Sequence, residues 1–332
     1  MYVLVAYLVG GIVNTGWRLK LFYWLYILLN LKMAQFVIRS YFWQRKEGVS
    51  ETFLAGGVGA GSTGFFSDSA DLGVAMCVAW ALTIPILFSR LNKIPRLFLI
   101  GSSMTFLGAI LFCGSRGALV GAAAIVAAAL FRAPKKLVPV FMATMFLAGL
   151  LYLLPTANWA RVRSAVDWRN DRNAQSRIAL WMVGLHMLRD HPLLGVGIGN
   201  YPNAYTRDYV DPAITTRAMA CHSMYIQALS ETGLTGMAIV LVVLYACFRL
   251  NSHTRRRIGM TWPEERQSFE YCLALGLDLA LVGFLAGAVF LSVLFYPMLW
   301  ILVGLSVGLH VACARRQTES ETPAPNPRMA TE

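Results

Sequence analysis

Long runs of apolar residues, separated by short clusters of charge, dominate the hydropathy pattern of the chain. A membrane-spanning helix needs about 20 mostly apolar residues, and only helices or closed barrels can cross a bilayer. The runs are continuous, whereas barrel strands alternate apolar and polar positions. The pattern predicts an all-α fold, a polytopic transmembrane helical bundle of about nine spans with one large periplasmic loop. The predicted helices cover residues 1–14, 21–38, 71–88, 97–113, 117–131, 137–154, 232–250, 271–291 and 297–313.

Five clusters of basic residues flank the predicted spans. Counting spans puts all five on one side, and the positive-inside rule makes that side the cytoplasm. Basic residues on the other side are fewer. The five clusters are Arg18 with Lys20, Arg90 with Lys93 and Arg96, Arg132 with Lys135 and Lys136, Arg249 with Arg255, Arg256 and Arg257, and Arg315 with Arg316.

This orientation divides the chain into four parts. Residues 1–154 are N-terminal transmembrane helices, and residues 155–222 are a periplasmic loop. Residues 223–316 are C-terminal transmembrane helices. Residues 317–332, rich in Pro, Thr and Glu, are expected to be a disordered cytoplasmic tail. We therefore expect a multi-pass protein of the bacterial inner membrane, in contact with membrane lipids, with any active site facing the periplasm.

Composition agrees with a membrane protein and excludes several soluble classes. The chain is 57% hydrophobic and 14% charged, whereas soluble domains carry roughly 25% charged residues. A net charge of +12 would suggest nucleic acid in a soluble protein, but here the basic residues flank apolar runs, so no nucleic-acid partner is expected. The six cysteines form no C-x-x-C pair, and we expect no metal site and no cofactor.

Three side chains are candidates for chemistry on the outer side. Arg116 sits in a tight turn, Gly114–Gly117, between two apolar runs, where an unpaired charge is costly. Arg177 lies in the first turns of a predicted amphipathic helix. His222 directly precedes Ser223, a suitable N-cap, and a helix N-terminus favours the neutral imidazole that a general base requires. The topology brings all three to one face, so we interpret them as catalytic residues.

The amphipathic helix is predicted over residues 174–190, where apolar side chains recur at helical spacing and Asp190–Pro192 ends the pattern. We expect it to lie on the membrane or to cover a site. Its apolar face is predicted to consist of Ile178, Trp181, Met182, Leu185 and Leu188.

The long loop is rich in arginine and contains no lysine. Arginine suits two-bond recognition of phosphate, so Arg163 and Arg217 are predicted to bind substrate together with Arg116 and Arg177. The glycines of Gly195–Asn200 indicate a turn after Pro192 and not a nucleotide-binding loop, because no strand precedes them and no P-loop lysine follows.

Two acidic residues lie in predicted helices. Glu231 is nine residues after His222, half a rotation away on a helix running straight from Ser223 to Leu250. It can orient His222 only if Gly233 or Gly236 breaks that helix. Asp278 is the one acid deep in a predicted span, and we expect it to hydrogen-bond a neighbouring helix.

Together these residues resemble a known family, the O-antigen ligases, which includes O-antigen polymerases and bacterial protein O-oligosaccharyltransferases. His222–Ser223 followed by Gly233–Gly236 resembles the family's H-[NSQ]-x9-G-x-x-G signature. Gly114–Gly117 is similar to its Ser-Arg-Gly segment. Ser176–Arg177, Trp181 and His191–Gly197 resemble the stretch that opens its periplasmic loop. The resemblance covers residues 56–250, although family members commonly have about a dozen spans.

The resemblance implies a metal-independent inverting glycosyltransferase. The donor it implies is a glycan on undecaprenyl pyrophosphate, and the acceptor is a hydroxyl of a lipid A core, a polysaccharide or a protein. By the same resemblance, His222 is the base that acts on the acceptor hydroxyl, and Arg116 and Arg177 bind the pyrophosphate.

Three alternatives remain open at the level of sequence. A polysaccharide polymerase of the same family would use the same donor. A transporter or flippase of cell-surface polysaccharide would bury several ionisable groups in the membrane, and Asp278 and Lys32 give it little support. A cysteine transpeptidase is suggested by Cys221 beside His222, but adjacent residues seldom face each other, so a nucleophile–base pair is not expected.

Overall fold

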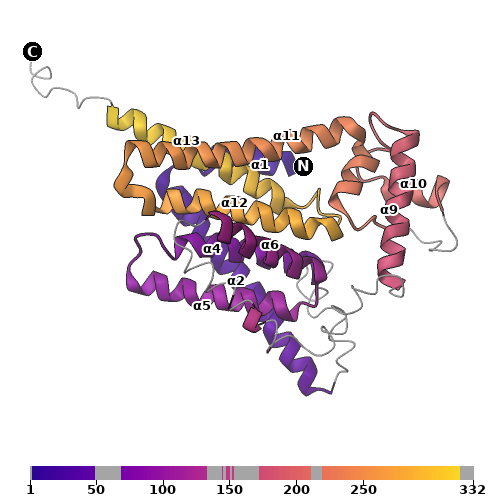
Figure 1. The fold of residues 1–332 in the computed structure, drawn as a ribbon, viewed down its shortest axis with the longest axis horizontal. Helices are drawn as coiled ribbons and strands as arrows, with labels where there is room; N and C mark the ends of the chain where they lie inside the picture. The colour runs from indigo at the N-terminus through magenta and orange to yellow at the C-terminus, as the bar shows by residue number, and fades with distance from the viewer. Residues whose placement is uncertain are drawn as a thin grey trace, which may run out of the picture.

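The computed structural model describes residues 2–48, 69–132, 144, 147–149, 152, 172–210 and 219–321. All regular structure within these ranges is helical, which confirms the predicted all-α fold (Figure 1). The helices are α1 (Tyr2–Ile12), α2 (Gly16–Lys46), α4 (Ser69–Ile86), α5 (Lys93–Phe112), α6 (Arg116–Arg132), α9 (Arg172–Asp190), α10 (Tyr201–Asp208), α11 (Met224–Thr261), η2 (Pro263–Gln267), α12 (Phe269–Gly287), η3 (Ala288–Phe290) and α13 (Pro297–Glu321).

Six of the described helices are long and apolar enough to cross a membrane, namely α2, α4, α5, α11, α12 with η3, and α13. A polytopic bundle is therefore confirmed. The predicted count of nine is not reached among these helices, because the run at 1–14 forms the 11-residue α1 and the run at 117–131 forms the 17-residue α6. Most of the run at 137–154 lies outside the described residues.

The centre of the bundle is formed by α4 and α12, which pack against each other and against α6. Within α4, 94% of the apolar window is buried, so this helix is surrounded by protein and not by lipid. Close packing of α12 with α6 depends on small residues: a side chain at Gly121 would approach the Gly283 carbonyl oxygen to 2.7 Å. Glycine pairs of this kind let membrane helices approach closely.

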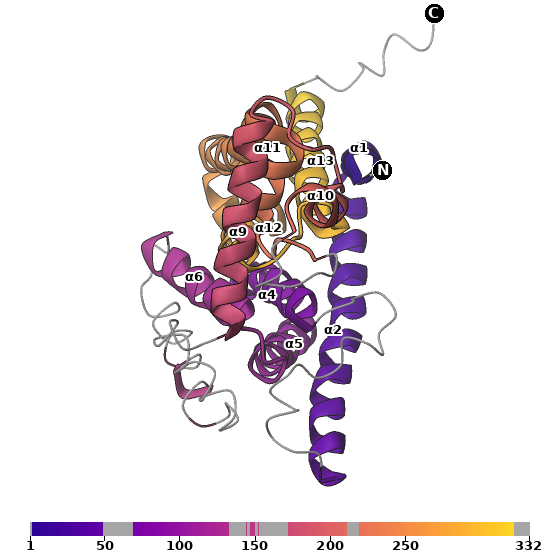
Figure 2. The same ribbon diagram turned by 90° about the vertical axis from the view of Figure 1, so that its right-hand side faces the viewer.

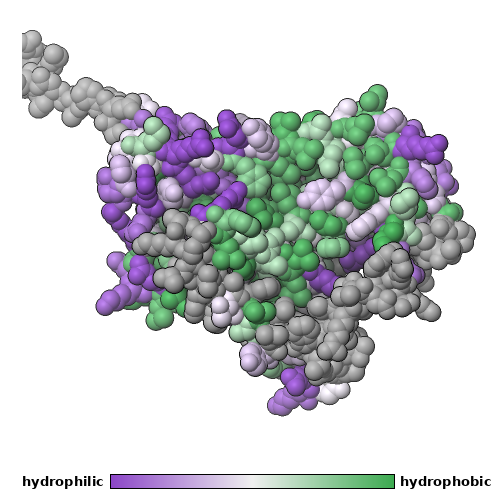
Figure 3. Space-filling model, in the orientation of Figure 1, coloured by the Kyte–Doolittle hydropathy of each residue, from purple (hydrophilic) through white to green (hydrophobic). Residues whose placement is uncertain are grey.

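All five basic clusters meet one segment, which runs from η2 to the middle of α12. A member of each contacts this segment, from Glu264 to Asp278, and Figure 3 shows hydrophilic surface at one end of the bundle, on the left, beside a broad hydrophobic band. The contacts are Lys20–Glu270 at 4.0 Å, Arg90 to the Glu264 carbonyl at 2.6 Å, Arg132–Asp278 at 3.6 Å, Arg255–Asp278 at 2.7 Å and Arg316–Glu265 at 2.7 Å.

Asp278 pairs with a neighbouring helix, as expected. Its Oδ1 accepts a hydrogen bond from Asn251 Nδ2 of α11 at 3.0 Å, and the ion pairs to Arg255 and Arg132 balance its charge. A buried carboxylate in a membrane is tolerable when it is paired in this way.

At the opposite end of the bundle, α9 runs across the other helices, with α10 beside it (Figure 2). These two helices share a small core of their own, separate from that of the bundle, made of Leu180, Val183, Met187, Tyr201, Ala204, Tyr205 and Cys221. We call the described residues of this part of the molecule, 172–210 and 219–221, the cap.

The predicted amphipathic helix at 174–190 is present as α9, and part of its predicted apolar face is exposed. Of the predicted stripe, Ile178, Met182 and Leu185 are exposed, whereas Leu180 and Met187 are fully buried. Apolar residues lie on both sides of α9, and periodicity alone does not indicate which side the rest of the protein covers.

Two helix ends also differ from the sequence pattern. A straight helix was expected from Ser223 to Leu250, but α11 is interrupted at Gly233, whose φ of 67° and ψ of −166° are not helical, and it continues to Thr261. At the C-terminus, α13 extends to Glu321, five residues into the tail that was predicted to begin at Gln317.

Candidate functional site

The connection between α12 and α13, residues 288–296, is a common neighbour of the site residues predicted from the sequence. Arg177 of α9 donates a hydrogen bond from Nη1 to the carbonyl oxygen of Phe290 at 3.5 Å. The turn that holds Arg116 meets the same residue, since a Cβ on Gly117 would lie 3.7 Å from Phe290 Cβ. Both arginines therefore lie at the cap end of the bundle, away from the basic clusters.

Arg116 is positioned by the tight turn predicted from Gly114 to Gly117. Gly114 adopts a φ of 70°, a conformation that other residues rarely take. The Ser115 hydroxyl then accepts a hydrogen bond from the Ala118 amide at 3.2 Å, as a helix N-cap does. Arg116 is the first residue of α6 and is half-buried, so the turn fixes where its backbone enters the site.

His222 occupies an unusual backbone conformation. Among the described residues it is the one non-glycine residue in the left-handed region, with a φ of 52°. Such a conformation costs free energy and concentrates at functional sites. The residue directly precedes Ser223, the N-cap position of α11, although the Ser223 side chain makes no capping bond. His222 is half-buried.

Cys221, the residue before His222, lies against the same connection between α12 and α13. Cys221 is buried, and its Sγ lies 3.5 Å from Ser292 Oγ. Arg177, the neighbour of Arg116 and the neighbour of His222 thus come from three distant parts of the chain and approach one nine-residue segment between α12 and α13. Arg163 and Arg217, the other predicted substrate-binding residues, lie outside the described residues.

Asp71 and Tyr296 belong to this end of the bundle and were not identified from the sequence. Asp71, at the start of α4, is buried, and its Oδ2 accepts a hydrogen bond from the Tyr296 hydroxyl at 2.6 Å. In the sequence, Asp71 is an acidic residue at the start of an apolar run. That pattern also occurs at ordinary helix N-termini, so it does not by itself indicate a site. A buried carboxylate beside a predicted arginine site is a stronger indication, but it requires the fold.

The glycine-rich turn after Pro192 pairs with the break in α11, and we call this pairing the interlock. Hydrogen bonds between backbone amides and carbonyls join the two segments. The segments lie so close that a Cβ on Gly233 would overlap the backbone of Leu193. The interpretation as a turn, and not a nucleotide loop, agrees with this structure. The bonds are Val196 N to Ser230 O at 2.8 Å, Gly197 N to Glu231 O at 3.0 Å and Leu234 N to Pro192 O at 2.8 Å.

Glu231 secures the interlock through its carboxylate. The buried carboxylate accepts hydrogen bonds from the Gly199 amide at 2.9 Å and the Tyr201 amide at 3.3 Å. Gly233 does break α11, which was the condition for Glu231 to orient His222. The carboxylate binds the start of α10, where amide groups need acceptors.

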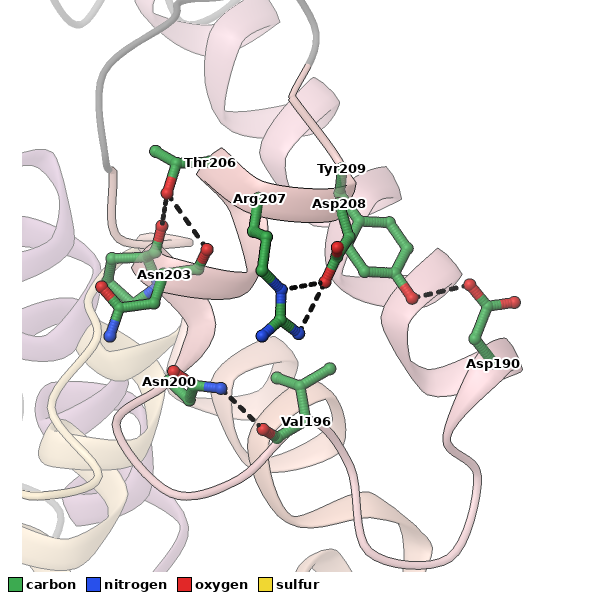
Figure 4. Close-up of polar contacts among 9 residues, drawn as sticks. Asp190, Val196, Asn200, Asn203, Thr206, Arg207, Asp208 and Tyr209 are labelled. Carbon is green, nitrogen blue, oxygen red and sulfur yellow. Dashed lines mark hydrogen bonds and ion pairs between the residues drawn. The ribbon is translucent and has the colours of Figure 1, made fainter.

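Figure 4 shows other polar side chains of the cap, which bond to one another and to the backbone. The Arg207 side chain is 76% exposed and pairs with Asp208 at 2.8 Å, so this loop arginine is surface charge. The Tyr209 hydroxyl donates to Asp190 Oδ2 at 2.7 Å, which joins the end of α10 to the end of α9. Asn200 Nδ2 donates to the Val196 carbonyl and closes the glycine-rich turn.

Replacing Cys221 with serine is expected to retain most of the protein's activity. Burial raises the pKa of the Cys221 thiol, and the reactive form of a cysteine is the thiolate, so the side chain suits packing better than nucleophilic attack. Activity of purified Cys221→Ser relative to the parent is the measurement. Loss of activity at normal membrane abundance would instead favour a cysteine mechanism.

Comparison with known families bears on this region. Residues 101–241 match the family model of the O-antigen ligases, which confirms the resemblance seen in the sequence. No curated protein matches the chain. Arg116, Arg177 and His222 lie inside the matched range, whereas Asp71 and Tyr296 lie outside it.

In the described residues, no group of three or more His, Cys, Asp or Glu side chains could hold a metal ion.

Proposed function

Because residues 101–241 match the family model of the O-antigen ligases and the chain is a polytopic membrane protein, we propose that the chain transfers a glycan from undecaprenyl pyrophosphate to an acceptor hydroxyl at the periplasmic face of the inner membrane. The observation that carries the proposal is the approach of Arg116, Arg177 and the His222 segment to one connection, residues 288–296, at the end opposite the basic clusters.

In this proposal the two arginines bind the pyrophosphate of the donor. Guanidinium groups form paired hydrogen bonds with phosphate oxygens. Pyrophosphate leaves readily once its developing charge is stabilised, and fixed donors provide that stabilisation without reorganisation during the reaction. Arg177 is held through Phe290 and Arg116 through its turn, so each comes from a rigid element.

His222 acts as the general base. It takes the proton of the acceptor hydroxyl as the acceptor oxygen forms a bond to the anomeric carbon, and the bond from that carbon to the pyrophosphate oxygen breaks. Attack opposite the leaving group inverts the anomeric configuration, and undecaprenyl pyrophosphate is released. The acceptor is a lipid A core, a polysaccharide or a protein, and a second lipid-linked glycan as acceptor would make the same chemistry a polymerase.

The transporter alternative is weakened by the surroundings of Asp278. This carboxylate was its main support, and it is neutralised by Arg255 and Arg132 near the basic end of the bundle. Lys32, the other ionisable group in a predicted span, is exposed on α2 and not enclosed in the bundle.

Purified protein is expected to transfer the glycan of a lipid-linked donor to an acceptor in the presence of excess chelator. Arginines supply the positive charge that a metal supplies in other transferases, so removal of divalent ions leaves the proposed site complete. Product formation is followed by mass spectrometry. Absence of transfer with every acceptor class would refute the function, and activity restored only by Mg²⁺ or Mn²⁺ would refute its metal independence.

A cysteine at position 206 is expected to react with an impermeant thiol reagent in intact spheroplasts, because the proposed topology puts the cap in the periplasm. All six native cysteines are buried, which keeps the background low. Thr206 is exposed on α10, and Gln267, exposed at the basic end, provides the matched control. Thr206→Cys should label in intact cells and Gln267→Cys only after lysis, and the reverse pattern would overturn the orientation.

A further inference from the structure

Trp181 carries a hydrogen-bond donor that the described part of the protein leaves unused. Its indole Nε1 is buried, and no acceptor among the described residues bonds to it. Buried tryptophan N–H groups normally find a partner, and each exception needs an explanation. Two other tryptophans follow the rule, since Trp80 donates to Ser103 Oγ at 3.0 Å and Trp300 donates to the Leu294 carbonyl at 3.1 Å.

The position of Trp181 supplies the explanation. Trp181 lies one helical turn after Arg177, and side chains four residues apart share a face of a helix. Both meet Phe290: Arg177 donates to its carbonyl oxygen, and the Trp181 ring lies against its ring at a centroid distance of 6.4 Å. A Cβ on Gly117, beside Arg116, would lie 3.7 Å from Cβ of the same Phe290. The ring that carries the unused donor therefore shares Phe290 with Arg177 and with the turn that holds Arg116.

We propose that Trp181 is a third group binding the donor substrate, with its Nε1–H hydrogen-bonded to a pyrophosphate oxygen. This inference rests on the proposed function. The indole adds a directional donor without adding charge, so it fixes the orientation of a phosphate that two guanidinium groups already attract. An anionic oxygen is the acceptor that the neighbouring arginines favour.

The test removes the N–H while keeping the ring. In one variant Trp181 is replaced by benzothienylalanine, in which sulfur takes the place of the indole N–H, and in another by phenylalanine, which retains an aromatic ring against Phe290. The matched control is Trp262→Phe, because Trp262 is a half-buried tryptophan at the basic end, where its ring lies 4.7 Å from Arg316. The probe is undecaprenyl pyrophosphate without a glycan, and its affinity and the melting temperature are measured on each purified protein.

Both Trp181 variants are expected to bind undecaprenyl pyrophosphate about 10- to 100-fold more weakly, the effect of losing a hydrogen bond to a charged group, with the control unchanged. Unchanged affinity, with or without a lower melting temperature, would overturn the inference. So would a loss seen only with the glycan-bearing donor, because the N–H would then recognise sugar. A parent protein that neither binds nor transfers the donor refutes the proposed function itself, whereas an active parent with equally active variants refutes only the role of Trp181.

Discussion

Replacing His222 with asparagine is expected to lower the turnover of glycan transfer about 10²- to 10⁴-fold, the usual contribution of a general base, while donor affinity stays within about twofold. Asparagine tolerates the left-handed backbone of position 222 better than most residues, so the substitution removes the base without disturbing the entrance to α11. The measurement is kcat from initial rates alongside the dissociation constant of the lipid-linked donor.

Substitutions of Arg116 and Arg177 are expected to have the opposite effect to that of His222→Asn, because they weaken donor binding. Arg116→Lys and Arg177→Lys keep a positive charge but lose the forked geometry, and donor affinity is expected to fall about tenfold. If His222→Asn abolishes donor binding while both lysine variants transfer normally, the roles are reversed. His222 would then bind the donor, and the arginines would be ordinary interfacial charges.

Gly233→Ala is expected to destabilise the protein by roughly 2–6 kcal/mol, the sum of backbone strain and forced overlap. The φ of 67° and ψ of −166° at Gly233 belong to a region that is almost restricted to glycine. A Cβ there would also meet the Leu193 backbone, so the interlock must open. Thermal unfolding of detergent-purified protein and the yield of folded protein in membranes are the measurements.

Gly101→Ala is the matched control, since Gly101 is in the middle of α5 and an added Cβ would meet nothing within 4 Å. That substitution is expected to be neutral or stabilising by up to about 1 kcal/mol, because alanine favours a helix over glycine. Equal melting temperatures for Gly233→Ala and the parent would show that the interlock contributes little to stability.

Hydropathy predicted the helices well because lipid and protein interiors both select apolar residues. The run at 71–88 predicted α4 whether lipid or neighbouring helices surround it, and the structure shows that neighbouring helices do. Span number was harder to predict, because runs such as that forming α6 fall just short of a bilayer's thickness. The large-scale orientation depended on charge, and the five clusters do meet one segment.

Other features required the three-dimensional structure. Gly195 and Gly233 were both visible as turn signals, but nothing in their local sequence indicates that they pair with each other across the interlock. Trp181 was part of a motif, yet its unused donor becomes apparent only when its surroundings are known. Local patterns encode local conformation, whereas these contacts depend on which distant segments the fold brings together.

The hydrogen bond between Asp71 and Tyr296 has a consequence for the biosynthesis of the protein. The two residues are 225 positions apart, and a ribosome that adds about 5–20 residues per second makes Tyr296 roughly 10–45 s after Asp71. Throughout that interval Asp71 lacks this partner. The connection that borders the site, residues 288–296, is made at the same late stage, so the site is completed only after α12 has been synthesised.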